Sequence, residues 1–194
     1  MAEVKVMSNI FYENIHYNPI IAAVKHLDML DSAMESPCKI IFLLTGNIFN
    51  LESMIEIAKE GQKGIFVHLD LMEGFSNDIV SLQYIHEKFN PDGIITTKGN
   101  LVKHAKGMGM FTIQRLFLLD SMSLETGKKS ISHTRPDAVE ILPGIIPKIT
   151  KDIHREIKIP IIVGGLIMDK EDVISSLNAG AVGISTSNKS IWYM

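Results

Sequence analysis

The sequence predicts an α/β protein, a compact (β/α)8 barrel of the TIM type with short helices and a truncated last helix. Short apolar segments alternate with helical segments at intervals of roughly 20 to 25 residues, which is typical of parallel strands joined by helices. No G-x-G-x-x-G sequence follows any strand, which disfavours the rival open doubly wound sheet. A glycine pair and a small polar turn follow the last two strands, where such barrels commonly bind phosphate.

Apolar β-branched runs predict eight strands, at residues 20–24, 39–44, 64–70, 93–96, 111–118, 138–142, 161–163 and 182–185. Helical periodicity between them predicts helices near residues 27–35, 51–60, 78–87, 101–106, 121–130, 148–156 and 170–178. The 194 residues are fewer than the usual length of about 250, which is why short helices are expected. We expect one barrel domain over residues 1–194. Residues 1–19 then form an N-terminal segment that covers the bottom of the barrel or packs against a neighbouring molecule in a homo-oligomer.

The composition is that of an ordinary globular protein, with 46% hydrophobic and 21% charged residues. A net charge of −3 offers no general attraction to nucleic acid or to an anionic membrane. Cys38 is the only cysteine, which excludes an internal disulfide and favours a reducing compartment. No apolar run reaches the length of a bilayer span, and the first residues lack the apolar core of a signal peptide. We therefore expect a cytoplasmic protein that does not bind membranes.

The loops after strands seven and eight carry the predicted phosphate site. Glycine has no Cβ, so a glycine pair lets the backbone approach a ligand closely. Hydroxyl, amide and backbone N–H groups at the start of a short helix form a natural anion site. The candidate phosphate ligands are Gly164, Gly165, Ser185, Thr186, Ser187 and Asn188.

Polar residues at the other strand ends are candidates for contacts with the rest of the ligand, because barrel sites lie at the carboxyl ends of strands. Lys25 could neutralise an anion or simply open the next helix, and Lys98 follows strand four. His68 and Asp70 share one parity on strand three, and Glu73 follows them in the loop. These three leave metal binding open. The sequence otherwise lacks a nucleotide-cofactor motif and metal-ligand spacing, so no cofactor and no metal are expected.

Strands five and six add three more polar candidates. The alternation of Thr112, Gln114 and Leu116 indicates that Gln114 faces the lumen, so Arg115 would point outward unless a bulge turns it. Glu140 stands in the apolar run VEIL, where an unpaired carboxylate would be costly. Arg115 and Gln114 are its expected partners, either in an ion pair that only supports the barrel or in a ligand site.

These residues resemble those of the bacterial glycerol-3-phosphate-responsive antiterminator family. The resemblance rests on the segments IIAAVK (20–25), IIFLLTGNI (40–48), VHLDLMEG (67–74), PDGIITTKGN (91–100), IQRLFLLDS (113–121), VEILPGIIP (139–147), IPIIVGGLI (159–167) and ISTSNKSIW (184–192). It implies a phosphate-site barrel that senses glycerol-3-phosphate. It also implies action on the leader mRNA of glycerol-utilisation genes to prevent transcription termination, without catalysis.

An RNA partner needs a basic surface, which the acidic chain as a whole does not offer. Lys148, Lys151, Arg155 and Lys158 follow one another at intervals of three, four and three residues, as one stripe of the helix after strand six. The stripe is a candidate RNA contact or a solvated outer face. The alternative function is an enzyme acting on a small phosphorylated polyol or triose, with Glu73 or Glu140 as acid or base.

Overall fold

In a computed structural model that describes residues 2–194, with side chains from residue 10 onward, eight parallel strands form a closed barrel in chain order. Ile21 of the first strand lies opposite both Ile40 of the second and Ser185 of the last, so the sheet has no free edge. The strands are β1 (Ile20–Val24), β2 (Ile40–Leu43), β3 (Gly64–His68), β4 (Gly93–Thr96), β5 (Phe111–Phe117), β6 (Ala138–Leu142), β7 (Ile161–Gly164) and β8 (Gly183–Thr186). The predicted fold class is confirmed.

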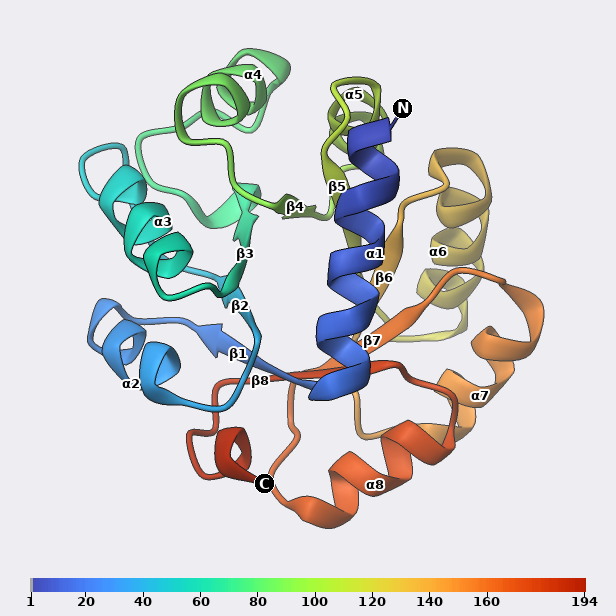
Figure 1. Cartoon of the computed structure of the whole chain (residues 1–194). Helices are drawn as coiled ribbons and strands as arrows, with labels where there is room; N and C mark the ends of the chain where they lie inside the picture. Colours follow the sequence, from blue (N-terminus) through green and yellow to red (C-terminus); the bar gives the residue numbers. More distant parts are fainter. Residues whose placement is uncertain (1) are drawn as a thin grey trace.

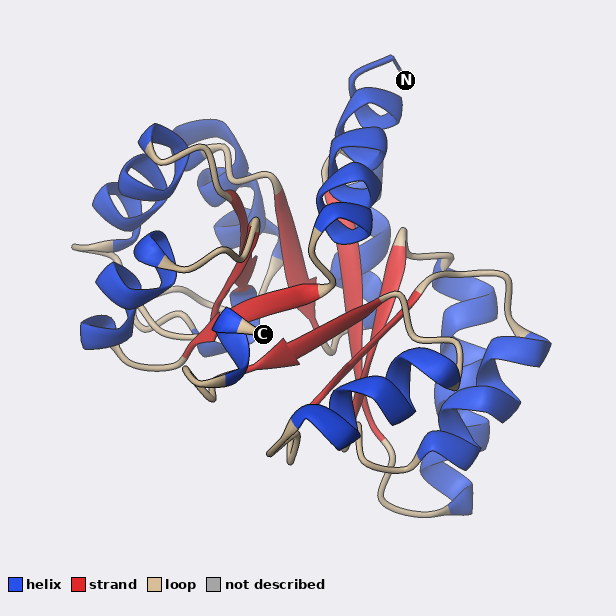
Figure 2. Cartoon of the chain, turned by 60° about the horizontal axis from the view of Figure 1, so that its bottom comes forward, coloured by secondary structure: helices blue, strands red, loops and turns tan. Residues whose placement is uncertain are grey.

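Helices surround the strands, while the first helix lies across one end of the barrel (Figure 1). The view in Figure 2 shows the strands enclosed by the outer helices. The helices are α1 (Ala2–Tyr17), α2 (Leu30–Glu35), α3 (Leu51–Glu60), α4 (Ile79–Phe89), α5 (Gly99–Gly107), α6 (Ser121–Thr134), α7 (Pro147–Glu156) and α8 (Lys170–Asn178), with the short 3-10 helices η1 (Leu27–Met29), η2 (Leu69–Leu71) and η3 (Ile191–Tyr193). After β8 only η3 follows, as the truncated last helix predicts.

Both faces of every strand are buried, because each strand packs against helices on its outer side and against other strands in the lumen. Phe42, Phe66, Phe111 and Ile113 belong to the lumen cluster, and the larger second cluster lies between the strands and the helices. The hydrophobicity of successive residues in such a strand therefore does not distinguish those that face the lumen from those that face the helices.

Helix α1 contributes side chains to the lumen at the end where the strands begin. Phe11 and Ile15 are buried in the lumen cluster, and the Phe11 ring lies 4.5 Å from that of Phe111 and 5.2 Å from that of Phe66, between centroids. These contacts close the bottom of the lumen. Residue 1 of the predicted N-terminal segment lies outside the described residues.

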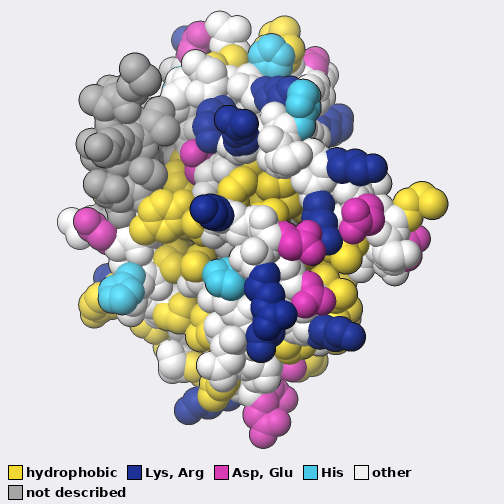
Figure 3. Space-filling model, turned by 90° about the vertical axis from the view of Figure 1, so that its right-hand side faces the viewer, with side chains coloured by type: hydrophobic (Ala, Val, Ile, Leu, Met, Phe, Trp, Pro, Cys, Tyr) yellow, Lys and Arg dark blue, Asp and Glu magenta, His cyan; other side chains and the backbone are white. Residues whose placement is uncertain are grey.

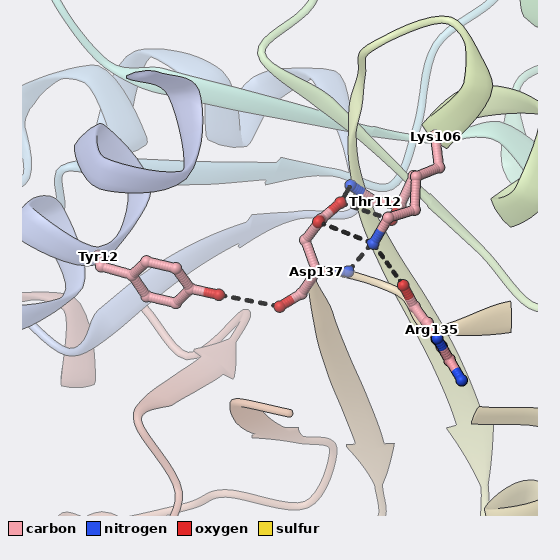
Figure 4. Close-up of polar contacts among 5 residues, drawn as sticks. All are labelled: Tyr12, Lys106, Thr112, Arg135 and Asp137. Atoms are coloured by element: carbon pink, nitrogen blue, oxygen red, sulfur yellow. Dashed lines mark hydrogen bonds and ion pairs between the residues drawn. The ribbon is translucent and has the colours of Figure 1, made fainter. Parts of the chain in front are cut away.

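Asp137, just before β6, joins several elements at the same end (Figure 4). Its Oδ2 accepts hydrogen bonds from the backbone N–H and the hydroxyl of Thr112, at 2.9 and 2.8 Å, and its Oδ1 lies 3.2 Å from the Lys106 ammonium. The Tyr12 hydroxyl of α1 donates to the Asp137 carbonyl at 2.9 Å. Burial, with a smaller effect of the Asp137 charge, raises the pKa of Tyr12 to about 12, so the phenol stays a donor.

Helix η3 fixes the turn that follows β8. The Trp192 side chain is fully buried, and its Nε1 donates to the Thr186 carbonyl at 2.8 Å. The Trp192 carbonyl in turn accepts from the buried Cys38 thiol at 3.6 Å. The turn at residues 187–190 is thereby held at both ends.

The third strand is shorter than the sequence predicted. Strand β3 ends at His68, so Asp70 lies in η2 and not on the strand, and the parity argument that paired it with His68 was wrong. Among residues 2–194, no helix combines the length and the hydropathy that a membrane crossing requires.

Candidate functional site

A cavity of about 410 Å³ opens at the carboxyl ends of the strands. Loops after β1, β7 and β8 form its wall, and polar side chains from β5 and β6 form its floor. Its lining consists of Ala23, Lys25, Leu44, Arg115, Glu140, Leu142, Gly165, Leu166, Ile167, Met168, Ser185, Thr186, Ser187 and Asn188. Gly164 is the buried last residue of β7, directly before this lining. The candidate phosphate residues therefore lie together in space.

The loop after β7 has an unusual backbone. Gly165 and Leu166 both have positive φ angles, 73° and 61°, and the second is uncommon for a residue with a Cβ. The Gly164 and Gly165 carbonyls accept hydrogen bonds from the Gly144 N–H, at 2.6 and 3.1 Å. In the described part of the chain, no group accepts a hydrogen bond from the N–H of Gly165, Leu166 or Ile167. Three backbone donors are thus available where the cavity opens.

The loop after β8 supplies a fourth such donor and ties the two loops together. The Asn188 amide donates to the Met168 carbonyl at 3.1 Å, and the Thr186 hydroxyl accepts from the Asn188 N–H at 3.1 Å. The Ser187 N–H has no acceptor among residues 2–194. Thr186 and Asn188 therefore use their side chains to hold the loop, which leaves the Ser187 N–H and the nearly buried Ser185 side chain beside the cavity.

An ion pair forms the floor of the cavity. Arg115 Nε donates to Glu140 Oε2 at 2.6 Å, and both side chains are buried. Glu140 Oε1 has no hydrogen-bond partner in the described chain. The predicted pairing of Glu140 with Arg115 is confirmed, and Arg115 points into the lumen.

Gln114 was placed on the wrong face of β5. Its Nε2 donates to the Ser130 hydroxyl and its Oε1 accepts from the Thr134 hydroxyl, both at 2.7 Å, and both partners belong to α6. Phe111 and Ile113 lie in the lumen cluster, so Arg115 shares their face and Gln114 takes the other. The alternation of Thr112, Gln114 and Leu116 was misleading because both faces of the strand are buried.

His68 and Asp70 lie outside the cavity lining. Burial, reinforced by the Arg115 charge and partly offset by Asp70, lowers the pKa of His68 to about 4, so the imidazole is neutral. Burial alone would raise the pKa of Asp70, but hydrogen bonds from the Thr96 hydroxyl and from the N–H and hydroxyl of Thr97 hold it below its ordinary value. The carboxylate of Asp70 thus joins the ends of β3 and β4.

Two other candidates, Glu73 and Lys98, are not among the residues that line the cavity. Glu73 is exposed, and its backbone pairs with Gly46 and Ile48. Lys98 is also exposed and donates to the Asn77 carbonyl at 3.3 Å. Throughout the described residues, no three or more His, Cys, Asp or Glu side chains are grouped so as to hold a metal ion.

The basic stripe lies on the outside of the molecule. Lys148, Lys151 and Arg155 are exposed on α7, but the helix ends at Glu156, so Lys158 lies beyond it and the stripe is shorter than predicted. Figure 3 shows the side of the molecule that lies at the right of Figure 1, where α6 and α7 are found. Basic side chains are spread over this face, with acidic ones between them.

The sequence analysis did not identify Leu166 and Ile167, which offer backbone N–H groups and not polar side chains to the cavity. Leu166 and Ile167 have apolar side chains, and only the preceding glycine pair indicated an unusual backbone there. The left-handed conformation of Leu166 has no signal in its residue type, because leucine rarely adopts it.

The fold and the cavity define a class, the closed (β/α)8 barrels with a cavity at the carboxyl ends of their strands. Residues 20–192 match the family model described as glycerol-3-phosphate responsive antiterminator. The chain belongs to that family.

Similar proteins agree with this assignment. An uncharacterized Escherichia coli protein, YgcP, is 40% identical over 178 residues, which are 92% of this chain and 93% of YgcP. The crystal structure of the glycerol uptake operon antiterminator regulatory protein from Listeria monocytogenes has a TM-score of 0.88 at 34% identity, over 90% of this chain and 95% of that one. A glycerol uptake operon antiterminator-related protein from Thermotoga maritima has a TM-score of 0.81 at 32% identity, over 90% and 98% of the two chains.

Proposed function

We propose that this protein binds glycerol-3-phosphate in the cavity between the loops after β7 and β8, and that in response it acts on leader mRNA of glycerol-utilisation genes to prevent transcription termination. Family membership supports the ligand, and the described role of the Listeria relative in a glycerol uptake operon supports the regulatory activity.

The main support for this ligand is a group of backbone N–H donors beside one cavity. The N–H groups of Gly165, Leu166, Ile167 and Ser187 have no acceptors in the described part of the chain. Clustered backbone donors bind anions because their dipoles point at the same position and need no side-chain ordering. Lys25 adds a positive charge to the same lining, which suits a phosphate ester. The polyol part then extends toward Arg115 and Glu140 on the floor.

The RNA assignment rests on a separate surface. Lys148, Lys151 and Arg155 project from α7, which packs on the outside of the barrel, and phosphate contacts by such side chains are the sequence-independent part of RNA binding. The loop after β6 begins next to the Gly144 contacts with the β7 loop and runs directly into α7. This connection offers a route from ligand occupancy to the RNA surface.

The test is RNA binding measured with and without ligand, using labelled leader RNA in a fluorescence anisotropy titration. We expect glycerol-3-phosphate to tighten binding and plain glycerol to have no effect. RNA affinity that is identical in both conditions would contradict ligand-dependent action on RNA. Product analysis of the same mixtures separates the enzyme alternative, since a regulator leaves glycerol-3-phosphate intact.

A further inference from the structure

In the buried carboxylate of Glu140, one oxygen accepts a hydrogen bond and the other does not. Oε2 accepts from Arg115, whereas Oε1 has no donor among the described residues, and the side chain is only 1% exposed. A charged acceptor that is buried without a donor is unfavourable, because it has lost its hydration and gained nothing in exchange. Because Glu140 also lines the cavity, a donor that enters the cavity can pair with this oxygen.

Gly164 keeps the space beside this oxygen open. A Cβ at position 164 would lie 3.0 Å from Glu140 Oε1, so any side chain there would press against the carboxylate. Gly164 directly precedes Gly165, whose N–H belongs to the proposed phosphate site. Since consecutive Cα atoms are about 3.8 Å apart, the free oxygen lies beside the residue that directly precedes the first of these backbone donors.

We propose that Glu140 Oε1 determines ligand specificity by accepting a hydrogen bond from the hydroxyl on the carbon next to the phosphate-bearing carbon. This inference rests on the proposed function. A carboxylate can only accept, a secondary alcohol can donate, and a ketone carbonyl at the same carbon can only accept. The site therefore selects glycerol-3-phosphate over dihydroxyacetone phosphate, whose carbonyl oxygen would face the carboxylate without a proton between them.

Calorimetric titration of the wild-type protein tests this selection. The probes are glycerol-3-phosphate, dihydroxyacetone phosphate, inorganic phosphate and 3-hydroxypropyl phosphate, which lacks the hydroxyl in question. A hydrogen bond to a charged group predicts that glycerol-3-phosphate binds about 10- to 100-fold more tightly than either of the other esters.

Glu140→Gln provides the second arm. Arg115 can only donate, so the amide oxygen of the glutamine will turn toward Arg115 and the amide NH₂ will occupy the position of Oε1. An acceptor becomes a donor there, and the preference for glycerol-3-phosphate over dihydroxyacetone phosphate should fall by at least about tenfold. Glu56→Gln, which removes the same charge from the exposed face of α3, should keep the wild-type preference.

The melting temperature and the affinity for inorganic phosphate verify that the Glu140→Gln variant keeps its fold and its phosphate site. Equal wild-type affinities for the three esters, or an unchanged preference in a folded Glu140→Gln variant, would overturn the inference and leave the proposed sensing role intact. Failure of every phosphate ester to bind would instead remove the proposed function, and this inference with it.

Discussion

At the scale of single residues, two buried charges of opposite sign define the floor of the cavity. The pairing of Arg115 with Glu140 could be predicted, because a carboxylate in an apolar strand requires a cation nearby. The direction of Gln114 could not, since hydrophobicity does not distinguish two buried faces of one strand. The sequence also could not predict that the N–H groups of the β7 loop lack acceptors, because every residue type except proline carries a backbone N–H.

His68 should make folding stability depend on pH. The pKa of His68 is about 4 in the folded protein, owing to burial and the Arg115 charge, whereas the ordinary pKa of histidine is 6.5. The unfolded chain therefore binds more protons between these values, and stability falls as pH falls from 6.5 toward 4, by up to about 3 kcal/mol. Urea unfolding at a series of pH values measures this loss.

His68→Gln should flatten that pH dependence, because the variant has no imidazole to protonate. Exposed His104 offers the matched control, and His104→Gln should keep the wild-type slope. Identical slopes for His68→Gln and the wild type would show that another group titrates in this range.

At the scale of elements, the predicted helices at residues 51–60 and 170–178 match α3 and α8, whereas the predicted end of the third strand was wrong. Residues 64–70 form one apolar and polar run, yet the chain turns into η2 after His68, where hydrogen bonds from Thr96 and Thr97 to Asp70 hold the turn. Those partners are more than twenty residues away, so local pattern carries no signal of them. Lys158 was counted in the stripe of α7, although the helix ends at Glu156, as the predicted range 148–156 also had it.

Helix α1 should stabilise the barrel mainly through Phe11. Phe11 is 2% exposed and stacks against lumen rings, so Phe11→Ala should lower the free energy of unfolding by about 3 to 5 kcal/mol. Ile10 on the same helix is 46% exposed, and Ile10→Ala should cost less than about 1 kcal/mol. Chemical denaturation checks both variants. A small effect of Phe11→Ala would mean that α1 merely rests on the barrel.

Helix α7 should carry RNA contacts if its basic stripe is functional. Lys151→Glu combined with Arg155→Glu should weaken leader RNA binding, and it should reduce the salt dependence by about one unit of slope per lost phosphate contact. Lys88→Glu with Lys170→Glu makes the same change of net charge on exposed positions of α4 and α8 and serves as the control. If both double variants lose RNA affinity equally, the effect is one of overall charge and not of α7.

At the scale of the whole molecule, the ring explains why residues far apart in sequence share one site. Closing β8 against β1 brings Lys25 to the same cavity as Ser187. The alternation of strands and helices predicted a parallel sheet covered by helices, and the missing G-x-G-x-x-G sequence and the polar turn after the last strand favoured the ring over an open sheet. Which loops touch each other depends on contacts such as that between Asn188 and Met168.

Ligand binding should stabilise the entire barrel, because the site exists only when the ring is closed. Glycerol-3-phosphate at a hundred times its Kd should add about 2.7 kcal/mol, which for a domain of this size raises Tm by about 5 to 10 °C. Plain glycerol at the same concentration should leave Tm unchanged, since it lacks the phosphate. Thermal denaturation followed by circular dichroism measures both, and an equal shift from the two compounds would contradict a site built for phosphate.

A crystal structure with glycerol-3-phosphate bound will show where the phosphate lies. We expect the phosphate oxygens within hydrogen-bond distance of the backbone N–H groups of Gly165, Leu166 and Ser187, with Lys25 beside them. A phosphate bound elsewhere, for example in the hollow beside α6 lined by Thr97, Phe117 and Ser123, would contradict the account.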